Sequence, residues 1–345
     1  MEFDTGLHRG TRQHGRGDRR LVPCDSLAQG KPGIRRRAAV VALLGVGMGA
    51  ARAACEGPSV PLEPLAPTLW QVPAAPGDAS ADNRGRVSNL LLAQDGDRLW
   101  LLGSGPSPAF GRALDCTLRA RFGRAASDIV SPWPRPELVL GVGGLSPARH
   151  WAHAAVAEAM RSSCPGCTQR LRQRLGAAAE DLGTDPVRLP TQHLQGRSGT
   201  LGPWQWRLDR RGAVHPVTVW THRASGIHLA SGLLWGDGAP DGRDADLDQL
   251  AAATAALAQQ AGREGGRWLG EQGPLLDAGA PALQARYWQW LLQAARRGVE
   301  AGDDELRAPA PPAELRELAA SPRHALNWQR AWRQAESGWL QRSLR

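Results

Sequence analysis

The stretch Ser131-Pro-Trp-Pro-Arg-Pro-Glu-Leu-Val-Leu-Gly141 decides how the rest of the chain is interpreted. A short apolar run, Asp128-Ile-Val130, precedes it and predicts a strand, and the run from Ala148 to Met160 that follows predicts a helix. Proline at alternate positions fixes the backbone φ angle and removes amide donors. The stretch therefore predicts a stiff, extended loop between a strand and a helix.

This segment resembles the one that carries the Thr/Ser-His-x-His-x-Asp-His motif of the metallo-β-lactamase superfamily. Aligned without gaps, Ser131 keeps the first position, and the four metal-ligand positions fall on Pro132, Pro134, Pro136 and Glu137. Hydrolytic zinc sites need imidazole and carboxylate ligands and an open position for water. Three of the four positions therefore lack a side chain that binds zinc.

Two further segments resemble parts of the same family and keep their glycines and apolar residues while losing an aspartate. Val87 to Gly105 is similar to the first strand pair, and Gly103 stands at the family's aspartate. Thr218 to Trp235 is similar to the strands that lead to the metal-bridging aspartate, and Gly232 stands there. Neither glycine supplies a side-chain ligand.

The remaining histidine positions of the family are also replaced. Counted back from Gly226, the third histidine falls on Ala213, and His215 is the nearest imidazole. Leu269 to Leu276 is similar to the last metal-binding loop, with Gln272 in place of its histidine. The resemblance therefore implies a degenerate member of the family, a pseudoenzyme without a zinc cofactor.

The resemblance covers roughly residues 82 to 335. It implies an α/β fold, the metallo-β-lactamase αββα sandwich with two mixed sheets, in a domain over 82–310 that is extended by C-terminal helices over 311–345. Within the superfamily the chain is similar to the periplasmic quinoprotein relay system zinc metallohydrolases. Cys164-Pro-Gly-Cys-Thr-Gln-Arg-Leu171 and the run from His324 to Glu336 carry that likeness, which implies a quinoprotein dehydrogenase system as a partner.

Hydrophobic periodicity predicts alternating strands and helices, as an α/β layered domain requires. The predicted strands cover 87–102, 128–130, 204–208 and 217–235. The predicted helices cover 108–122, 147–162, 168–180, 245–262 and 280–299. Helices are also predicted from Ala313 onward, with Trp328, Trp332 and Trp339 on their apolar stripe.

Residues 1–53 predict an export leader, with a signal peptide over 33–53. This part has a basic start, an apolar stretch of about a dozen residues and the cleavage pattern Ala51-Arg-Ala53. The apolar stretch is too short to predict a membrane span, so we expect a periplasmic or secreted product. Residues 54–81, rich in proline and alanine, predict a linker.

The net charge of the chain comes largely from the leader. The 42 Lys and Arg exceed the 33 Asp and Glu, and the leader holds 10 of the basic and 4 of the acidic residues, which leaves 32 against 29. A nucleic-acid-binding domain needs a clustered basic face, whereas the mature sequence mixes its arginines with acids. Nucleic acid is therefore excluded as a partner.

Cysteine usage is typical of an oxidising compartment. Cys164 and Cys167 lie at a predicted junction between two helices, and a structural disulfide between them is favoured. A redox-active pair is the alternative, although the Trp-Cys-Gly-Pro-Cys context of thioredoxins is absent. Cys55 and Cys116 form a second candidate pair.

Two other patterns have structural explanations. His150 and His153 are three apart on the predicted helix over 147–162 and, without a third ligand nearby, are expected to be surface or packing residues. Gly141-Val-Gly-Gly144 lacks the spacing of a phosphate-binding loop. The chain also contains no Gly-x-Ser-x-Gly nucleophile motif.

Two functions from different classes remain. The favoured one is a non-catalytic binding or accessory protein whose cleft engages a protein or small-molecule partner, with Trp133, Glu137 and His215 as cleft candidates. The alternative is a metal-dependent hydrolase of the metallo-β-lactamase superfamily in which His215, His222 and His228 rebuild a zinc site. Metal content distinguishes the two.

Overall fold

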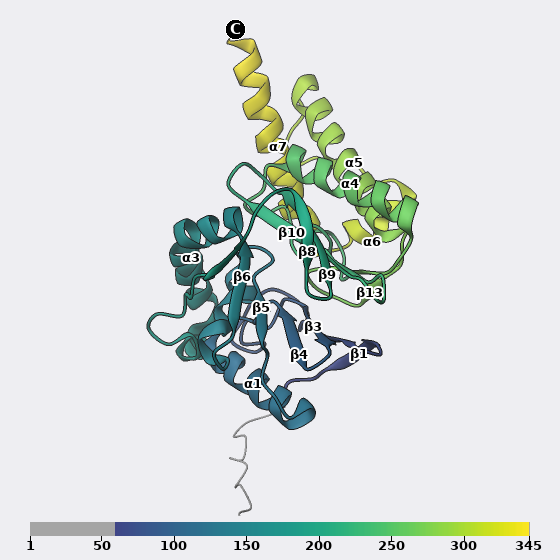
Figure 1. Ribbon diagram of the computed structural model, residues 1–345. Coiled ribbons are helices and arrows are strands. Elements are labelled where there is room, and N and C mark those ends of the chain that lie inside the picture. Colours follow the sequence, from purple (N-terminus) through teal and green to yellow (C-terminus); the bar gives the residue numbers. More distant parts are fainter. Residues whose placement is uncertain (1–58, 345) are drawn as a thin grey trace, which may run out of the picture. The chain divides into compact units, whose positions relative to one another are not determined.

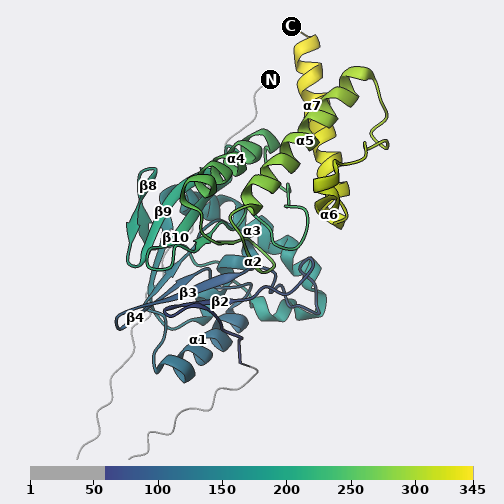
Figure 2. The same cartoon turned by 90° about the vertical axis from the view of Figure 1, so that its right-hand side faces the viewer.

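The computed structural model describes residues 59–344. Two mixed sheets lie face to face, and helices cover the outer face of each, so that the layers follow the order α, β, β, α (Figure 1, Figure 2). The expected sandwich of two mixed sheets is confirmed. The leader, its signal peptide and Cys55 lie outside the described residues.

The first sheet contains seven strands in sequence order. They are β1 (Glu63–Ala66), β2 (Leu69–Val72), β3 (Leu90–Asp95), β4 (Arg98–Leu102), β5 (Asp128–Val130), β6 (Arg149–His153) and β7 (Gln192–Leu194). Neighbours from β1 to β4 are antiparallel, and neighbours from β4 to β7 are parallel.

The second sheet contains six strands in the order β13-β12-β11-β10-β9-β8. They are β8 (Ser198–Leu201), β9 (Trp204–Arg210), β10 (Pro216–His222), β11 (His228–Leu229), β12 (Trp268–Leu269) and β13 (Leu275–Leu276). Only the β11–β12 pair among them is parallel. The expected strand over 217–235 is thus two strands joined by a turn, followed by a loop.

Helices α1 and α3 lie on the first sheet, and α4 and α5 lie on the second (Figure 2). The helices are α1 (Pro108–Phe122), α2 (Pro136–Val139), α3 (Ala154–Leu175), α4 (Leu247–Glu264), α5 (Ala280–Ala301), α6 (Arg316–Ala319) and α7 (Pro322–Ser343). Short 3₁₀ helices are η1 (Leu140–Gly144), η2 (Gly176–Leu182) and η3 (Ala313–Leu315). No helix within residues 59–344 is long and apolar enough to cross a membrane.

The β3–β4 hairpin is apolar on both faces because both faces are buried. Side chains alternate along a strand, so Leu91 and Trp100 enter the cluster between the sheets, where they meet Trp204 and Trp220 of the second sheet. Leu90, on the opposite face, packs in the other core cluster, beneath the helices. The continuous apolar run therefore reflects a strand covered on both sides.

Asn89, which is fully buried, links the first sheet to the loop after β12. Its Oδ1 accepts hydrogen bonds from Gln71 Nε2 (2.8 Å) and the Ala74 amide (2.9 Å). Its Nδ2 donates to the carbonyls of Gly270 (3.1 Å) and Gly273 (2.9 Å). All four hydrogen-bonding positions of the amide are thereby used.

The segment over 54–81, predicted to be a linker, is part of the first sheet where it is described. It contains β1 and β2, and the strand β2 is buried at every position. Trp70 and Val72 pack in the core, and Trp70 meets Phe122 of α1 edge-on at a ring-centroid distance of 4.9 Å. Proline and alanine content misled the prediction, because packing of a few large side chains is enough to order the segment.

The helix predicted over 147–162 begins only at Ala154, because the preceding residues form β6. His150 and His153 therefore lie on a strand, where residues three apart face opposite sides of the sheet. Both are buried packing residues: His150 Nε2 lies 2.8 Å from Ser131 Oγ, and His153 Nδ1 accepts from the Ala155 amide and caps α3.

Helix α3 continues through Pro165, so Cys164 and Cys167 lie inside one helix and not at a junction. The predicted disulfide between them is wrong, because both thiols are free. Residues three apart on a helix hold their Cβ atoms about 5–6 Å apart, farther than a disulfide allows. Cys116 is disulfide-bonded, with a partner outside the described residues, so its pairing with Cys55 stays a prediction.

Burial also raises the pKa of Cys164 to about 12 and raises that of Cys167, so neither thiol is ionised near neutral pH. A redox-active pair needs a thiolate, and these environments disfavour one.

In the C-terminal helices, Trp328 and Trp332 are buried as predicted, whereas Trp339 is 42% exposed and is not part of the apolar face.

The glycines of Gly141-Val-Gly-Gly144 allow η1 to touch α1 backbone to backbone. A Cβ atom at Gly144 would lie 1.9 Å from the Pro108 carbonyl oxygen, and one at Gly141 would lie 1.9 Å from that of Ser104. Gly143, between them, has no atom nearer than 3.6 Å to its Cβ position. The glycine cluster is thus explained by close packing.

We expect Gly144→Ala to lower the free energy of unfolding by roughly 2 kcal/mol or more, because η1 and α1 must move apart. Gly143→Ala is the matched control and is expected to change it by less than about 1 kcal/mol. Urea unfolding of the two variants measures both values, and equal losses would contradict the close-packing explanation.

We also expect stability to fall as the pH drops from about 6.5 to about 4. Burial lowers the pKa of His150 and of His228 to about 4, below the unfolded-state value of roughly 6.5. In this window the unfolded chain binds more protons than the folded chain, which costs about 3 kcal/mol per histidine at its acidic end.

Urea unfolding at several pH values tests this dependence. His150→Gln is expected to reduce the slope of unfolding free energy against pH, and His193→Gln is the control because His193 is exposed. An identical slope in the wild type and in His150→Gln would show that His150 does not contribute.

Candidate functional site

A cavity of about 80 Å³ lies at the carboxyl end of β5. The loop between β5 and α2, helix α3, the turn between β9 and β10 and the loop over 241–244 line it. Five of its lining residues are arginines and three are acids: Arg135, Arg170, Arg174, Arg211 and Arg243, with Glu137, Asp241 and Asp244. The cavity is thus lined by more cationic than anionic groups.

The loop that enters the cavity is held at both of its sides. Ser131 bonds to His150 through its side chain, and its amide donates to the Trp151 carbonyl (2.9 Å). The carbonyl of Pro132 accepts from the amide and from Oγ1 of Thr218, both at 2.8 Å, which ties the loop to β10 in the second sheet. The backbone then bends at Trp133 and enters α2 at Pro136, so the extended path predicted over the prolines is short.

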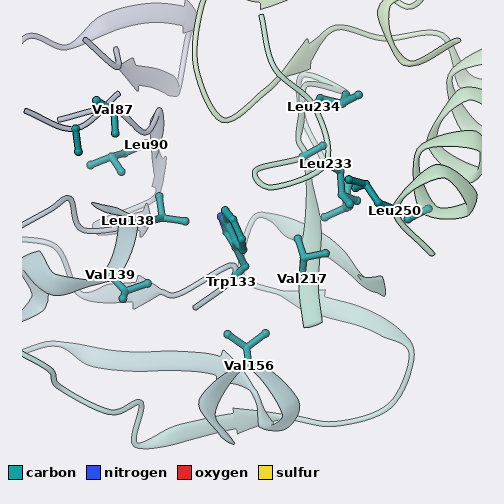
Figure 3. Close-up of a cluster of buried hydrophobic side chains, with 14 of the residues drawn as sticks. Val87, Leu90, Trp133, Leu138, Val139, Val156, Val217, Leu233, Leu234 and Leu250 are labelled. Carbon is teal, nitrogen blue, oxygen red and sulfur yellow. The ribbon is translucent and has the colours of Figure 1, made fainter. Parts of the chain in front are cut away.

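Trp133 fills the space between the two halves of the fold. Its side chain is 7% exposed and lies between Leu138 on one side and Val217 and Leu233 on the other (Figure 3). The indole Nε1 donates a hydrogen bond to Glu271 (3.1 Å), so its polar atom is satisfied. Trp133 also lines the cavity.

The ring of Trp133 also occupies the space next to Gly232. Gly232 has a φ angle of +80°, and a Cβ atom built there would lie 3.0 Å from the indole ring. A side chain at this position would press on the tryptophan, so the ring would have to shift by a few tenths of an ångström. The glycine and the indole ring, which are far apart in the sequence, therefore fit each other closely.

Arg135 and two acids form a buried ion-pair network beside Trp133. Arg135 Nε lies 3.3 Å from Glu137 and 3.6 Å from Glu271, and the guanidinium also lies 5.7 Å from the Trp133 ring centroid. Burial would lower the pKa of Arg135, but Glu137 and Glu271 outweigh it and raise that pKa. Burial raises the pKa of Glu271, although Arg135, Ser88 and Trp133 oppose the shift.

Arg211 is buried and its guanidinium also lies near the Trp133 ring, with 4.7 Å between Cζ and the ring centroid. Its backbone is fixed in the turn after β9, where its amide donates to the His215 carbonyl (2.9 Å). The side chain donates from Nη2 to the Asp241 carbonyl. Burial, and to a smaller degree Arg135, lowers the pKa of Arg211 to about 10, so it remains a cation at neutral pH.

The structure gathers only part of the predicted site. Pro134, Pro136, Glu137 and His215 line the cavity together with Trp133. Pro132 is not among the lining residues, and its carbonyl accepts a hydrogen bond from Thr218.

Ala213 and Gln272 do not line the cavity. Ala213 is exposed in the β9–β10 turn. Gln272 is buried, donating to the Gly77 carbonyl (2.9 Å) and accepting from Arg323 (2.7 Å). Sequence alignment placed both residues in the site, but their side chains serve other contacts.

The histidines of the rearranged-site alternative do not converge. His215 precedes β10, whereas His222 ends it, so roughly 20 Å of extended chain separates them. His228 bonds to Thr221, whose neighbour His222 must face the opposite side of the sheet. Within residues 59–344, no group of three or more His, Cys, Asp or Glu side chains is placed to hold a metal ion.

A zinc ion, which the fold family implies, is not matched by the residues present. The positions that the sequence resemblance assigns to the metal ligands carry proline, alanine, glycine, glutamine and one acid, and only the acid provides an atom that zinc prefers. The one acid among them, Glu137, is engaged by Arg135 and by Arg174 (3.9 Å). The donor set therefore does not fit a zinc centre.

Sequence reasoning missed the arginines and Glu271. Arg211 lies in Asp209-Arg-Arg-Gly-Ala213, which has the composition of an exposed turn. Glu271 lies beside Gln272 in a segment already singled out, but nothing in its local sequence indicates complete burial. Its place in the loop between β12 and β13, which also contains Gly270 and Gly273, was the only available signal.

Solved structures similar to this chain are metallo-β-lactamase superfamily members. The mono-zinc form of the metallo-β-lactamase FIM-1 from Pseudomonas aeruginosa has a TM-score of 0.54 and 16% identity, covering 67% of this chain and 96% of that chain. A metallo-β-lactamase from Hirschia baltica has a TM-score of 0.51 and 10% identity, covering 67% and 98%.

The stereoselective inverting sec-alkylsulfatase Pisa1 from Pseudomonas sp. has a TM-score of 0.60 and 13% identity, covering 79% of this chain and 49% of that chain. No protein-family model matches the chain, and no curated protein does. At identities this low, the structural likeness shows the fold alone, and the expected metallo-β-lactamase fold is confirmed.

We expect Gly232→Ala to destabilise the protein by roughly 2 kcal/mol or more. A positive φ costs an L-residue about 1 kcal/mol, and the contact with Trp133 adds to it. Gly226→Ala is the matched control, because Gly226 has a φ of +68° and no atom within 4 Å of its Cβ position.

A double-mutant cycle separates the two contributions. In a Trp133→Ala background, the ring is absent, and the cost of Gly232→Ala is expected to fall to that of Gly226→Ala. Additive losses in the cycle, measured by urea unfolding, would show that the ring does not occupy the space beside residue 232.

Proposed function

We propose that the protein is an exported, non-catalytic binding protein that keeps the metallo-β-lactamase fold and uses the Trp133 cavity in place of a metal centre. Its place of action is the periplasm or the secreted fraction, as the leader over residues 1–53 predicts. The molecule is thus a pseudoenzyme whose cleft recognises a partner.

The packing of Trp133 against Gly232 carries this proposal. The indole ring occupies the space that a side chain at residue 232 would need, with 3.0 Å between the ring and the Cβ position. The ring is held by its hydrogen bond to Glu271 and lies near the guanidinium groups of Arg135 and Arg211. An aspartate introduced at residue 232 alone would therefore meet the indole ring.

The chemistry of the lining residues supports a binding role. Hydrolysis in this fold relies on a metal that lowers the pKa of bound water to about 7. Glu137 and Glu271 are the acids nearest Trp133, and both are engaged by Arg135. An acid held in an ion pair is poorly suited to act as a general base, and no nucleophile with an adjacent base lines the cavity in the described chain.

A quinoprotein dehydrogenase system is the proposed setting. This part of the proposal rests on the sequence likeness over Cys164 to Leu171 and over His324 to Glu336. Both stretches have structural roles as well. Cys164 packs in the core, and the His324 ring of α7 is hydrogen-bonded to the Tyr287 hydroxyl of α5. A pull-down of the tagged mature protein from periplasm that contains a quinoprotein dehydrogenase tests this association.

We expect the purified mature protein to hold far less than one zinc or iron per chain, even after dialysis against zinc. We also expect no hydrolysis of β-lactams, thioesters or lactones above the rate in buffer, because the ligand positions lack metal-binding atoms. Elemental analysis and spectrophotometric assays measure these properties, with an active metallo-β-lactamase as the positive control.

The hydrolase alternative makes the opposite prediction. Zinc at about one ion per chain, lost on replacement of His215 or His222, would establish a relocated site and would overturn the proposal. Hydrolysis that disappears with a chelator and returns with zinc would do the same.

A further inference from the structure

Arg211 differs from the other buried arginine of the cavity in having no acid beside it. Arg135 is paired with Glu137 and Glu271. No carboxylate of residues 59–344 lies within 4.0 Å of the Arg211 guanidinium nitrogens, although Arg211 is only 2% exposed. Arg211 bonds to the backbone carbonyl of Asp241, but the carboxylate of that residue pairs with Arg243 (3.6 Å) and Arg330 (3.7 Å).

The hydrogen bonding of Arg211 is also incomplete. Nη2 donates to the Asp241 carbonyl, whereas Nε is buried and finds no hydrogen-bond partner among the described residues. The faces of the guanidinium are covered by aromatic rings, with 4.7 Å to the centroid of Trp133 and 5.8 Å to that of Trp235. Aromatic faces stabilise a cation but do not accept its hydrogen bonds as an oxyanion does.

A buried cation without a partner is costly, and native structures rarely contain one unless something binds it. Burial lowers the pKa of Arg211 to about 10, although the charges of Asp241, Glu271 and Asp244, which lie beyond ion-pair distance, oppose the shift. The group therefore keeps its proton near neutral pH and has no hydrogen-bonded acid in the described part of the chain. The surrounding field adds to the imbalance, since five arginines and three acids line the cavity. A negative charge in the cavity would offset both the cost of burying the Arg211 guanidinium and the excess of positive charge in the lining.

The size of the cavity limits what it can hold. It measures about 80 Å³, and a water molecule needs roughly 10–15 Å³ on the same scale. The space therefore suits a ligand of about six non-hydrogen atoms. The planar fork of a guanidinium matches the two oxygens of a carboxylate, and a tetrahedral oxyanion offers the same acceptor spacing.

We infer that the cavity binds a small oxyanion, of the size of pyruvate or sulfate, through the guanidinium of Arg211, with the Trp133 indole as its flat wall. This inference rests on the proposed function, because it assigns a ligand class to the cleft that replaces the metal centre. The cleft has thereby changed from a site for a cation to a site for an anion.

Isothermal titration calorimetry of the mature protein tests the inference with sodium pyruvate, sodium acetate and sodium sulfate, in a sodium chloride background. We expect at least one of these anions to bind and methylammonium chloride not to bind. Preference for pyruvate and acetate over sulfate assigns a carboxylate ligand, and the reverse order assigns a tetrahedral oxyanion.

Arg211→Gln is expected to weaken the binding of that anion by roughly tenfold or more, since hydrogen bonds between charged groups contribute about 1.5–3 kcal/mol. Arg223→Gln is the matched control, because it removes the same charge from an exposed turn at the far end of β10. It is expected to leave the affinity within about twofold.

A thermal melt of the same variants separates ligand binding from a structural role. Without ligand, Arg211→Gln is expected to melt no lower than the wild type, because the buried cation is gone, yet its melting temperature no longer rises when the anion is added. If Arg211→Gln does not fold, Arg211→Lys takes its place, since it keeps the charge but loses the fork and is expected to bind more weakly.

Two results would overturn the inference. One is the absence of binding for all three anions up to millimolar concentration, and the other is unchanged affinity in Arg211→Gln. Neither result depends on the metal content or hydrolysis assays. A positive outcome in those assays would remove the proposed function, whereas a failure of anion binding alone would leave a metal-free cleft with a ligand of another class.

Discussion

The packing of the Trp133 indole against Glu271 and near two guanidinium groups is the interaction on which the site depends. The ring excludes a side chain at Gly232, its Nε1 satisfies Glu271, and its position fixes the loop that begins at Ser131. Glu271 in turn pairs with Arg135, so the ring and the charges are mutually dependent. Removing the indole, Glu271 or Arg135 would leave a buried polar group without its partner, which is costly in a low-dielectric interior.

The same constraint explains why the two sheets hold a defined relation at this end of the molecule. Pro132 accepts two hydrogen bonds from Thr218. The side-chain amide of Asn89 makes hydrogen bonds both to the segment before β3 and to the loop after β12. Apolar contacts alone would tolerate small shifts between the layers. Directional hydrogen bonds between buried groups do not, and they position the cavity walls.

Charge is where this cleft departs most from a hydrolytic metal centre. A zinc site gathers neutral imidazoles and carboxylates around a cation. Here the loop positions carry prolines, and the cations are supplied by the protein itself as Arg135 and Arg211. Arg135 has acids within ion-pair distance, whereas Arg211 has one carbonyl and nearby aromatic rings, and the charges of Asp241, Glu271 and Asp244 act on it from farther away. The asymmetry between these two arginines is what makes an anionic ligand physically reasonable.

The sequence by itself predicted the helix Pro108–Phe122 and the strand Asp128–Val130 from local periodicity, and the α/β sandwich from the likeness of its motifs to a known family. It did not determine that residues 63–72 form strands, that His150 lies on one, or that α3 runs through Pro165, because distant packing overrides weak local signals there. Only the tertiary structure decided the burial of Arg211 and Glu271, since an arginine or an acid looks the same in sequence whether it faces solvent or a core. The partners come from other segments of the chain, since Glu271 bonds to Trp133, 138 residues away, and Arg211 bonds to the Asp241 carbonyl, 30 residues away, and these contacts give the cleft its charge.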